Sequence, residues 1–177
     1  MKVWPVPKSS PNLVFEKSFW EDRGDRFHCG VDIYAKAGSS VLNIDSGDVI
    51  KTGIFTSSSM IPYWNKTFYV DVKMNKEFFC RFAEMKSINV TKGDILKPGD
   101  MIGFVGCVLN KEKINKNSPL YIQKLSESGK VSMLHFELYK NKPIDISDNN
   151  YLGGNWFGNN KPENLIDATD FLKTCKK

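Results

Sequence analysis

Short runs rich in Val, Ile, Phe and Tyr alternate along the chain with clusters of Gly, Pro, Asn, Asp and Ser. Apolar runs of this length, separated at close intervals by turn-forming residues, are typical of β-strands joined by short turns. The stretches expected to form strands are residues 39–55, which read as strand-turn-strand, and residues 67–75, 77–85, 100–109 and 132–140. The pattern predicts an all-β fold of mainly antiparallel sheets, with roughly seven or more strands and one sheet forming the floor of a groove.

Helical periodicity is found near the C-terminus, in residues 162–175. Apolar side chains recur there at a spacing that would place them on one face of a helix, with a proline near the start and lysines at the end. This face would hold Leu165, Ile166, Thr169, Leu172 and Cys175. A short C-terminal helix is therefore expected. In contrast, the Lys-, Ser- and Asn-rich segment from Asn110 to Lys130 predicts a long loop inserted between two strands.

The chain of 177 residues is 41% hydrophobic and has no apolar stretch of membrane-spanning length. This length is enough for one well-formed core. We therefore expect a single domain over residues 1–177, with its core at 27–139, the inserted loop at 110–130 and a C-terminal extension at 140–177.

The 25 basic and 20 acidic residues leave a net charge of +5, which could favour an anionic partner. The lysines are scattered and form no basic helix, so nucleic-acid binding is not expected. The N-terminal residues show no secretory signal, and the compartment stays open. The four cysteines, Cys29, Cys80, Cys107 and Cys175, form no CxxC pair. Buried free thiols are the favoured interpretation, since disulfides would require export.

The chain has only two histidines, His28 and His135, and each lies in a stretch with strand character. If the first stretch is extended, alternation places His28, Gly30 and Asp32 on one face, opposite Cys29, Val31 and Ile33. The same alternation in residues 132–139 separates an apolar face from a second face. The apolar face holds Leu134, Phe136 and Leu138, and the second holds Met133, His135 and Glu137. His135 is thus expected to point away from the packed core and into a site.

Two imidazoles and one carboxylate are the ligand set of a catalytic zinc ion, which keeps a fourth position for water. The His-x-x-x-Asp spacing of His28 and Asp32, followed by a strand-turn-strand and a distant His135 on an alternating strand, favours this combination. A Zn²⁺ site is therefore predicted.

The chain from about Phe27 to Leu138 also resembles the lysostaphin- and LytM-type zinc endopeptidases, which cut peptidoglycan cross-bridges. Residues 27–53 (FHCGVDIYAKAGSSVLNIDSGDVIKTG), 87–106 (SINVTKGDILKPGDMIGFVG) and 134–139 (LHFELY) carry the resemblance. It implies a lysostaphin-type fold with a core like that of a barrel-sandwich hybrid. It also implies that His28, Asp32 and His135 are the zinc ligands. Glu137 and Met133, on the same face as His135, are expected to contact the ligands or line the groove.

The chain departs from this family at two positions. The family's last motif is His-x-His. The first histidine of that motif and a further histidine, in a Tyr-Ala-His-Leu-like segment, handle the catalytic water and the oxyanion. Here Met133 stands at the first of these positions and Glu84, in FAEM, at the second. The resemblance thus implies a divergent member that lacks both catalytic imidazoles.

These observations leave three functions open. The domain could be a metalloendopeptidase-like relative of peptidoglycan hydrolases with weak or lost activity, or an active hydrolase that uses Glu84 as its base. It could instead be a non-catalytic, zinc-stabilised module that binds a cell-wall peptide or a protein partner. The hairpin around KGDILKPGDMIG also resembles lipoyl and biotinyl carriers, but Lys92 and Lys97 lack the flanking recognition motif.

Two further patterns concern the surroundings of the site. The tripeptide Arg23–Asp25 precedes His28 closely, which predicts a loop at the rim of the site. Four aromatic residues in Gly-, Asn- and Pro-rich segments are expected to anchor loops or to form the walls of a groove. These are Tyr63, Trp64, Trp156 and Phe157.

Overall fold

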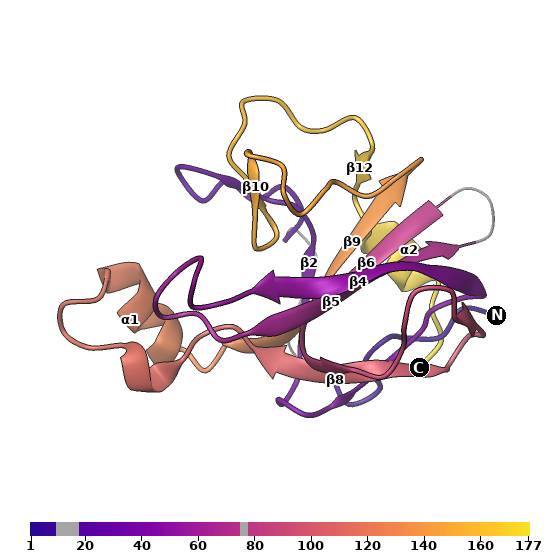
Figure 1. Cartoon of the computed structure of the whole chain (residues 1–177), viewed down its shortest axis with the longest axis horizontal. Coiled ribbons are helices and arrows are strands. Elements are labelled where there is room, and N and C mark those ends of the chain that lie inside the picture. The colour runs from indigo at the N-terminus through magenta and orange to yellow at the C-terminus, as the bar shows by residue number, and fades with distance from the viewer. Residues whose placement is uncertain (10–17, 75–77) are drawn as a thin grey trace.

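A computed structural model describes residues 1–9, 18–74 and 78–177 of the chain (Figure 1). Nine of the strands in these residues form one curled sheet whose pairings are antiparallel. They are β2 (Val31–Tyr34), β3 (Ser40–Leu42), β4 (Gly47–Thr56), β5 (Thr67–Met74), β6 (Phe78–Ile88), β7 (Ile95–Leu96), β8 (Met101–Cys107), β9 (Ser132–Lys140) and β12 (Leu165–Ile166). The predicted all-β fold is confirmed. Residue 75, the last of one predicted strand, and residue 77, the first of the next, lie outside the described residues.

A second, smaller antiparallel sheet lies beside the first. It contains β1 (Phe27–His28), β11 (Asn155–Trp156) and β10 (Tyr151–Leu152). The predicted strand around His28 is therefore divided: β1 belongs to the small sheet and β2 to the large one. Cys29, expected to share a face with Val31 and Ile33, packs in a different apolar cluster from theirs.

The main core fills one face of the curled sheet and contains the side chains predicted for it, Leu134, Phe136 and Leu138. The opposite face of β9 is also covered, by a second apolar cluster that includes Phe55, Tyr139 and Tyr151. His135 and Glu137 are consequently buried, although the sequence pattern predicted an open face. The four cysteines are free, and Cys29 and Cys80 are fully buried.

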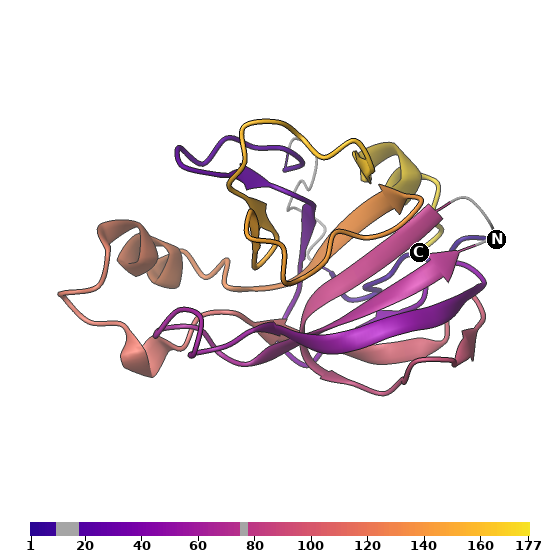
Figure 2. The same ribbon diagram turned by 45° about the horizontal axis from the view of Figure 1, so that its top comes forward.

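The predicted C-terminal helix is shorter than expected. Leu165 and Ile166 form β12 and pair with Tyr139 and Leu138 of β9, so the helix α2 comprises only Thr169–Lys173. Pairing with the sheet satisfies the backbone of β12 and buries Leu165, which outweighs the helical spacing. In Figures 1 and 2, α2 lies beside β9.

The prediction of a continuous loop between Asn110 and Lys130 is wrong. This segment contains a 3₁₀ turn, η1 (Lys111–Lys113), and the helix α1 (Leu120–Glu127). On α1, Ile122 and Leu125 lie three positions apart and pack in one apolar cluster with Val108 and Leu109. The insertion projects from the end of the molecule opposite the two termini (Figures 1 and 2). No helix in the described part of the chain is long and apolar enough to cross a membrane.

The strand β6 changes partner along its length, and this change shapes the site. Residues 78–83 pair with β9, whereas Met85, Ser87 and Ile88 pair with β8. Glu84 lies at the fork with φ of 61°, in the left-handed region that costs a non-glycine residue roughly 1–2 kcal/mol. In β8, a Cβ atom on Gly106 would lie 2.5 Å from the Glu84 carbonyl oxygen. The fork therefore requires close backbone contact at Gly106.

We expect Gly106→Ala to lower the free energy of unfolding by about 1–3 kcal/mol, because the new methyl group meets backbone atoms that cannot move aside. Urea unfolding followed by circular dichroism measures the change. Gly53→Ala in β4 is the matched control, since its new Cβ would meet a side-chain ring carbon of Tyr69 at 3.0 Å instead of backbone. Equal stability of the two variants would contradict this account of the fork.

Candidate metal centre

The register of the large sheet places Asp32 and His135 side by side. Asp32 of β2 pairs with His135 of β9, and His135 pairs on its other side with Ala83 of β6. His28 comes from the small sheet, where it pairs with Asn155. The backbone N–H of Cys29 donates to the Gly154 carbonyl at 2.8 Å, which holds this turn against the β10–β11 hairpin. The two sheets therefore meet at these three side chains.

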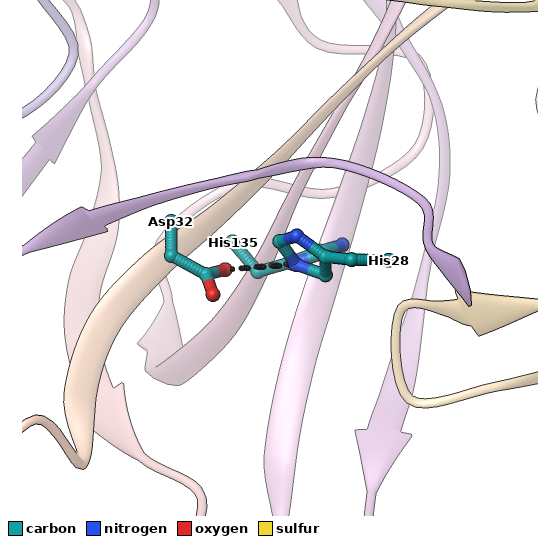
Figure 3. Close-up of side chains that lie close together, drawn as sticks. All are labelled: His28, Asp32 and His135. Atoms are coloured by element: carbon teal, nitrogen blue, oxygen red, sulfur yellow. Dashed lines mark hydrogen bonds and ion pairs between the residues drawn. The ribbon is translucent and has the colours of Figure 1, made fainter. Parts of the chain in front are cut away.

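The predicted ligands converge in the structure (Figure 3). His28 Nε2 lies 3.1 Å from His135 Nδ1 and 3.2 Å from Asp32 Oδ1, and His135 Nδ1 lies 3.0 Å from the same carboxylate oxygen. All three side chains are buried. One acceptor atom from each residue thus occupies a corner of a nearly equilateral triangle.

Hydrogen bonds on the far side of each imidazole orient the rings. His28 Nδ1 lies 2.7 Å from the Ser18 carbonyl oxygen, so this nitrogen donates and Nε2 keeps its lone pair. His135 Nε2 lies 2.9 Å from Glu137 Oε1, so it donates there and Nδ1 keeps its lone pair. In the neutral tautomers that metal binding requires, both free lone pairs face Asp32 Oδ1. Outer hydrogen bonds of this kind are typical of histidines that bind metal.

The dimensions of the triangle fit a zinc ion. Tetrahedral bonds of about 2.0–2.1 Å separate two ligand atoms by roughly 3.3 Å. The observed separations of 3.0–3.2 Å are close to this value. Two neutral imidazoles and one carboxylate are also a donor set that zinc accepts. These three residues could therefore hold Zn²⁺ with small adjustments.

A cavity of about 550 Å³ adjoins this triangle. Glu84 and Met133, which stand where the family resemblance implied catalytic histidines, both line it. Glu84 is buried, and its Oε2 has no hydrogen-bond partner among the described residues. Arg23 and Asp25 also line the cavity, as their expected place at the rim requires. Three of the four aromatic residues singled out above contribute to the wall: Tyr63, Trp64 and Phe157.

A family model, "Peptidase family M23", matches residues 26–146 of the chain. The chain belongs to peptidase family M23. The match includes all three residues of the triangle together with Glu84, Met133 and Glu137. No curated protein sequence matched the chain.

Solved structures support the same fold. The M23 chain is similar to lysostaphin from Staphylococcus simulans at 20% identity, with a TM-score of 0.52, over 83% of this chain and 44% of that one. The lysostaphin catalytic domain alone gives 18% identity and a TM-score of 0.53, covering 98% and 92% of the two chains. A zinc-containing peptidase from Vibrio cholerae gives 22% identity and 0.51, over 81% and 38%. Csd3 from Helicobacter pylori gives 26% identity and 0.50, over 82% and 32%. The chain thus spans less than half the length of full-length lysostaphin and of Csd3.

In this M23 domain, Glu137 is held by a buried network that the sequence did not reveal. Its carboxylate accepts hydrogen bonds from the hydroxyls of Tyr151, at 2.7 Å, and Tyr139, and Arg81 Nη1 lies 3.3 Å from Oε2. Arg81 in turn makes a two-pronged pair with Asp71 at 2.8 and 2.9 Å. Glu137 was predicted only to contact the ligands or line the groove on the same face as His135. The structure shows it connecting that histidine to a buried arginine.

Electrostatics in the site follow from burial and from these contacts. Burial disfavours the ionised form of Glu137, but the hydrogen bond from His135 and the nearby Arg81 together lower its pKa to about 2. Burial likewise opposes ionisation of Asp32, yet without a metal the charge of protonated His28 and the hydrogen bonds that His135 and His28 then donate hold its pKa well below the usual range. Burial and the neighbouring Asp32 raise the pKa of Glu84 to about 7. Glu137 and Asp32 are therefore anions at neutral pH, whereas Glu84 exchanges its proton near that pH.

Two glycines make room for the ring of His135. A Cβ on Gly154 would lie 2.5 Å from His135 Nε2, and one on Gly30 would lie 2.9 Å from its Cε1. The Phe55 ring stacks on the imidazole with centroids 5.7 Å apart.

Arg23 approaches the other side of the site, with Nη2 3.6 Å from Asp32 Oδ2 and Nη1 3.1 Å from Asn155 Oδ1. The sequence identified the ligand candidates, but not this enclosure by the C-terminal hairpin.

We expect Arg81→Met to lower the free energy of unfolding by roughly 3–5 kcal/mol, because it leaves the buried carboxylates of Asp71 and Glu137 without their counter-charge. Chemical denaturation measures this. Lys51→Met is the matched control: its pair with Asp145 at 3.5 Å is exposed, and its loss should change stability by less than about 0.5 kcal/mol. A small effect at Arg81 would show that the network is not a stabilising unit.

Proposed function

We propose that this M23 domain holds one zinc ion on His28 Nε2, Asp32 and His135 Nδ1, binds a peptide or peptidoglycan-like ligand beside it, and hydrolyses peptide bonds weakly or not at all. The observation that carries the proposal is the convergence of two imidazole nitrogens on one carboxylate oxygen, each ring held by a hydrogen bond on its far side. Membership of family M23 and the likeness to a zinc-containing peptidase support it.

A zinc ion held in this way would supply a polarised water with a pKa near ~7 and a Lewis acid for a peptide carbonyl. The remaining work falls to side chains around the cavity. A base must accept the proton of the attacking water, and a donor must stabilise the tetrahedral oxyanion. Peptide hydrolysis therefore needs two further groups of suitable chemistry.

The residues at the two divergent positions supply these roles poorly. The Met133 side chain ends in a thioether, which neither accepts a proton usefully nor donates a hydrogen bond to an oxyanion. Glu84 is a carboxylate and, when ionised, repels negative charge. Loss of a positioned acid or base costs about 10²- to 10⁴-fold in rate. This deficit favours a domain whose principal remaining property is ligand binding, to a cell-wall peptide or a protein partner.

One observation favours a second candidate function, an active hydrolase that uses Glu84 as its base. Glu84 is buried, lines the cavity beside the triangle and leaves one oxygen without a partner. A carboxylate so placed is available to a ligand or to a water. It can accept a proton, but it cannot at the same time stabilise the oxyanion as an anion. The two candidates differ in whether hydrolysis depends on this one side chain.

We expect the purified protein to bind one equivalent of zinc and Asp32→Ala or His135→Ala to lose stoichiometric binding, because each removes one of three ligands. Inductively coupled plasma mass spectrometry and competition with a chromophoric chelator measure the content and affinity. Asp25→Ala is the matched control: it removes an exposed carboxylate of the preceding loop and should retain the metal.

Glu137→Gln should weaken zinc affinity by about 10- to 100-fold, as for other outer partners of metal-bound histidines. Retention of tight stoichiometric zinc by His135→Ala would refute the ligand assignment.

We expect the zinc-loaded protein to cleave glycine-rich and stem-peptide substrates far below the roughly 1–10³ s⁻¹ of ordinary enzymes. The double variant Glu84→His/Met133→His should raise the rate by at least about 10²-fold, because it supplies the two imidazoles that the family resemblance places there. Histidine also tolerates the positive φ at position 84 better than most residues. Mass spectrometry of the products measures cleavage.

The single variant Glu84→Gln separates the two candidate functions in the same assay. If it abolishes a measurable wild-type rate while the zinc content is unchanged, the active-hydrolase candidate is correct. Cleavage by the wild-type protein at ordinary enzyme rates would overturn the proposal of weak or lost activity.

A further inference from the structure

The inserted segment that carries α1 lies along one side of the cavity beside the metal centre. Six residues from three stretches, here called the apolar wall, line the cavity and pack against one another: Tyr63, Trp64, Val108, Leu109, Ile122 and Leu125. Val108, Leu109 and Ile122 are buried, so the wall is itself a small core. It lies on the same cavity as His28, Asp32 and His135.

Backbone hydrogen bonds hold the wall in place. Trp64 and Leu109 form an antiparallel bridge. The N–H of Asn65 donates to the Val108 carbonyl at 2.7 Å, and the N–H of Asn110 donates to the Tyr63 carbonyl at 2.9 Å. The Asn65 side-chain amide adds two more bonds, to the carbonyls of Cys107 and Leu109, each at 3.0 Å. The wall is therefore preformed, and a ligand need not order it on binding.

The cavity is suited to an apolar occupant of some size. Its volume of about 550 Å³ falls within the roughly 300–1,000 Å³ typical of small-molecule sites. The charged side chains that line it are balanced, three basic and three acidic: Arg23, Arg26, Lys130, Asp25, Asp32 and Glu84. This balance gives no preference for a strongly charged ligand. A glycine residue would leave the apolar wall in contact with water.

We propose that the apolar wall is a subsite for a bulky aliphatic or aromatic side chain, carried by the residue of a peptide ligand that lies next to the metal centre. The inference rests on the proposed zinc centre, which anchors the peptide, and adds a substrate class to it. Burial of a side chain such as Leu or Phe favours such peptides over a glycine counterpart by about 10- to 100-fold in affinity. The unpaired Oε2 of Glu84 can accept a hydrogen bond from the peptide backbone in the same cavity.

Three hydroxamates that differ only in their side chain test the subsite without requiring catalysis: those of N-acetylglycine, N-acetylleucine and N-acetylphenylalanine. The hydroxamate chelates zinc in each case and presents the side chain beside the metal. Isothermal titration of the zinc-loaded full chain should give dissociation constants about 10- to 100-fold lower for the Leu and Phe probes than for the Gly probe. Equal affinities for the three probes would overturn the subsite while leaving the zinc centre intact.

Matched variants on α1 locate the preference. Leu125→Ala shortens a residue of the apolar wall and should reduce the Phe-to-Gly affinity ratio by at least about threefold. Leu120→Ala, the same substitution on the same helix, changes a residue that is 64% exposed and does not line the cavity, so the ratio should be unchanged. Tyr121→Ala is a second wall-side variant at a half-exposed position that lines the cavity, for use if Leu125→Ala fails to fold. An unchanged ratio in a folded wall-side variant counts against the proposal.

Failure of the zinc centre gives a different result from failure of the subsite. If none of the three hydroxamates binds and no zinc is retained, the proposed metal centre is wrong and the subsite falls with it. If all three bind to wild type, and binding is lost in Asp32→Ala, the metal anchor is intact and the affinity ratio alone decides the subsite.

Discussion

The site depends on a buried ion pair, that of Arg81 with Asp71 and Glu137, which lies behind His135 on the covered face of the sheet. Removing these charges from water costs several kcal/mol per ion, and the cost is offset only by good geometry and further hydrogen bonds. The tyrosines of positions 139 and 151 and the Ile144 carbonyl supply these bonds. Because Glu137 is kept ionised, it accepts a hydrogen bond from the Nε2–H group of His135. This favours the tautomer in which Nδ1 is free to bind a metal.

This constraint explains why the C-terminal extension folds over the sheet. Tyr151 and the Ile144 carbonyl belong to residues 140–177, as does Gly154, whose missing side chain leaves space for the His135 ring. Asn155 pairs with His28 and accepts a hydrogen bond from Arg23. Without the extension, the charges behind His135 would face water, and His28 would lose the strand β11 with which it pairs. The extension is thus a structural part of the site, although it lies largely beyond the segment that resembles the family in sequence.

Local sequence patterns revealed the part of the site that depends on alternation along a strand. The period of two predicted Leu134, Phe136 and Leu138 in the core and His135 on the opposite face, and the structure shows this arrangement. The register of β2 with β9 then brings Asp32 beside His135. Burial of that opposite face was not predicted, since it depends on residues such as Phe55 and Tyr151 that are more than ten positions away in the chain. Arg81 was read only as part of a strand, because a lone arginine carries no signal of its partners. Likewise, β12 and α1 depend on contacts with β9 and with Val108, which short-range periodicity cannot show.

The structure also separates the residues proposed to hold the metal from those that would act on a ligand. His135 lies in the interior of β9 between two paired strands, and its ring is fixed by Glu137, so substitution nearby would disturb the whole network. Glu84 and Met133 lie instead where β6 passes from β9 to β8 and where β8 meets β9. Neither side chain belongs to the Arg81 network, and both face the cavity. Exchange of the chemical groups at these two positions therefore breaks no hydrogen bond of the proposed metal ligands or their supports, although Glu84 feels the charge of Asp32. This separation is a physical reason why a domain of this fold can keep the geometry of a metal site with different groups at these two positions.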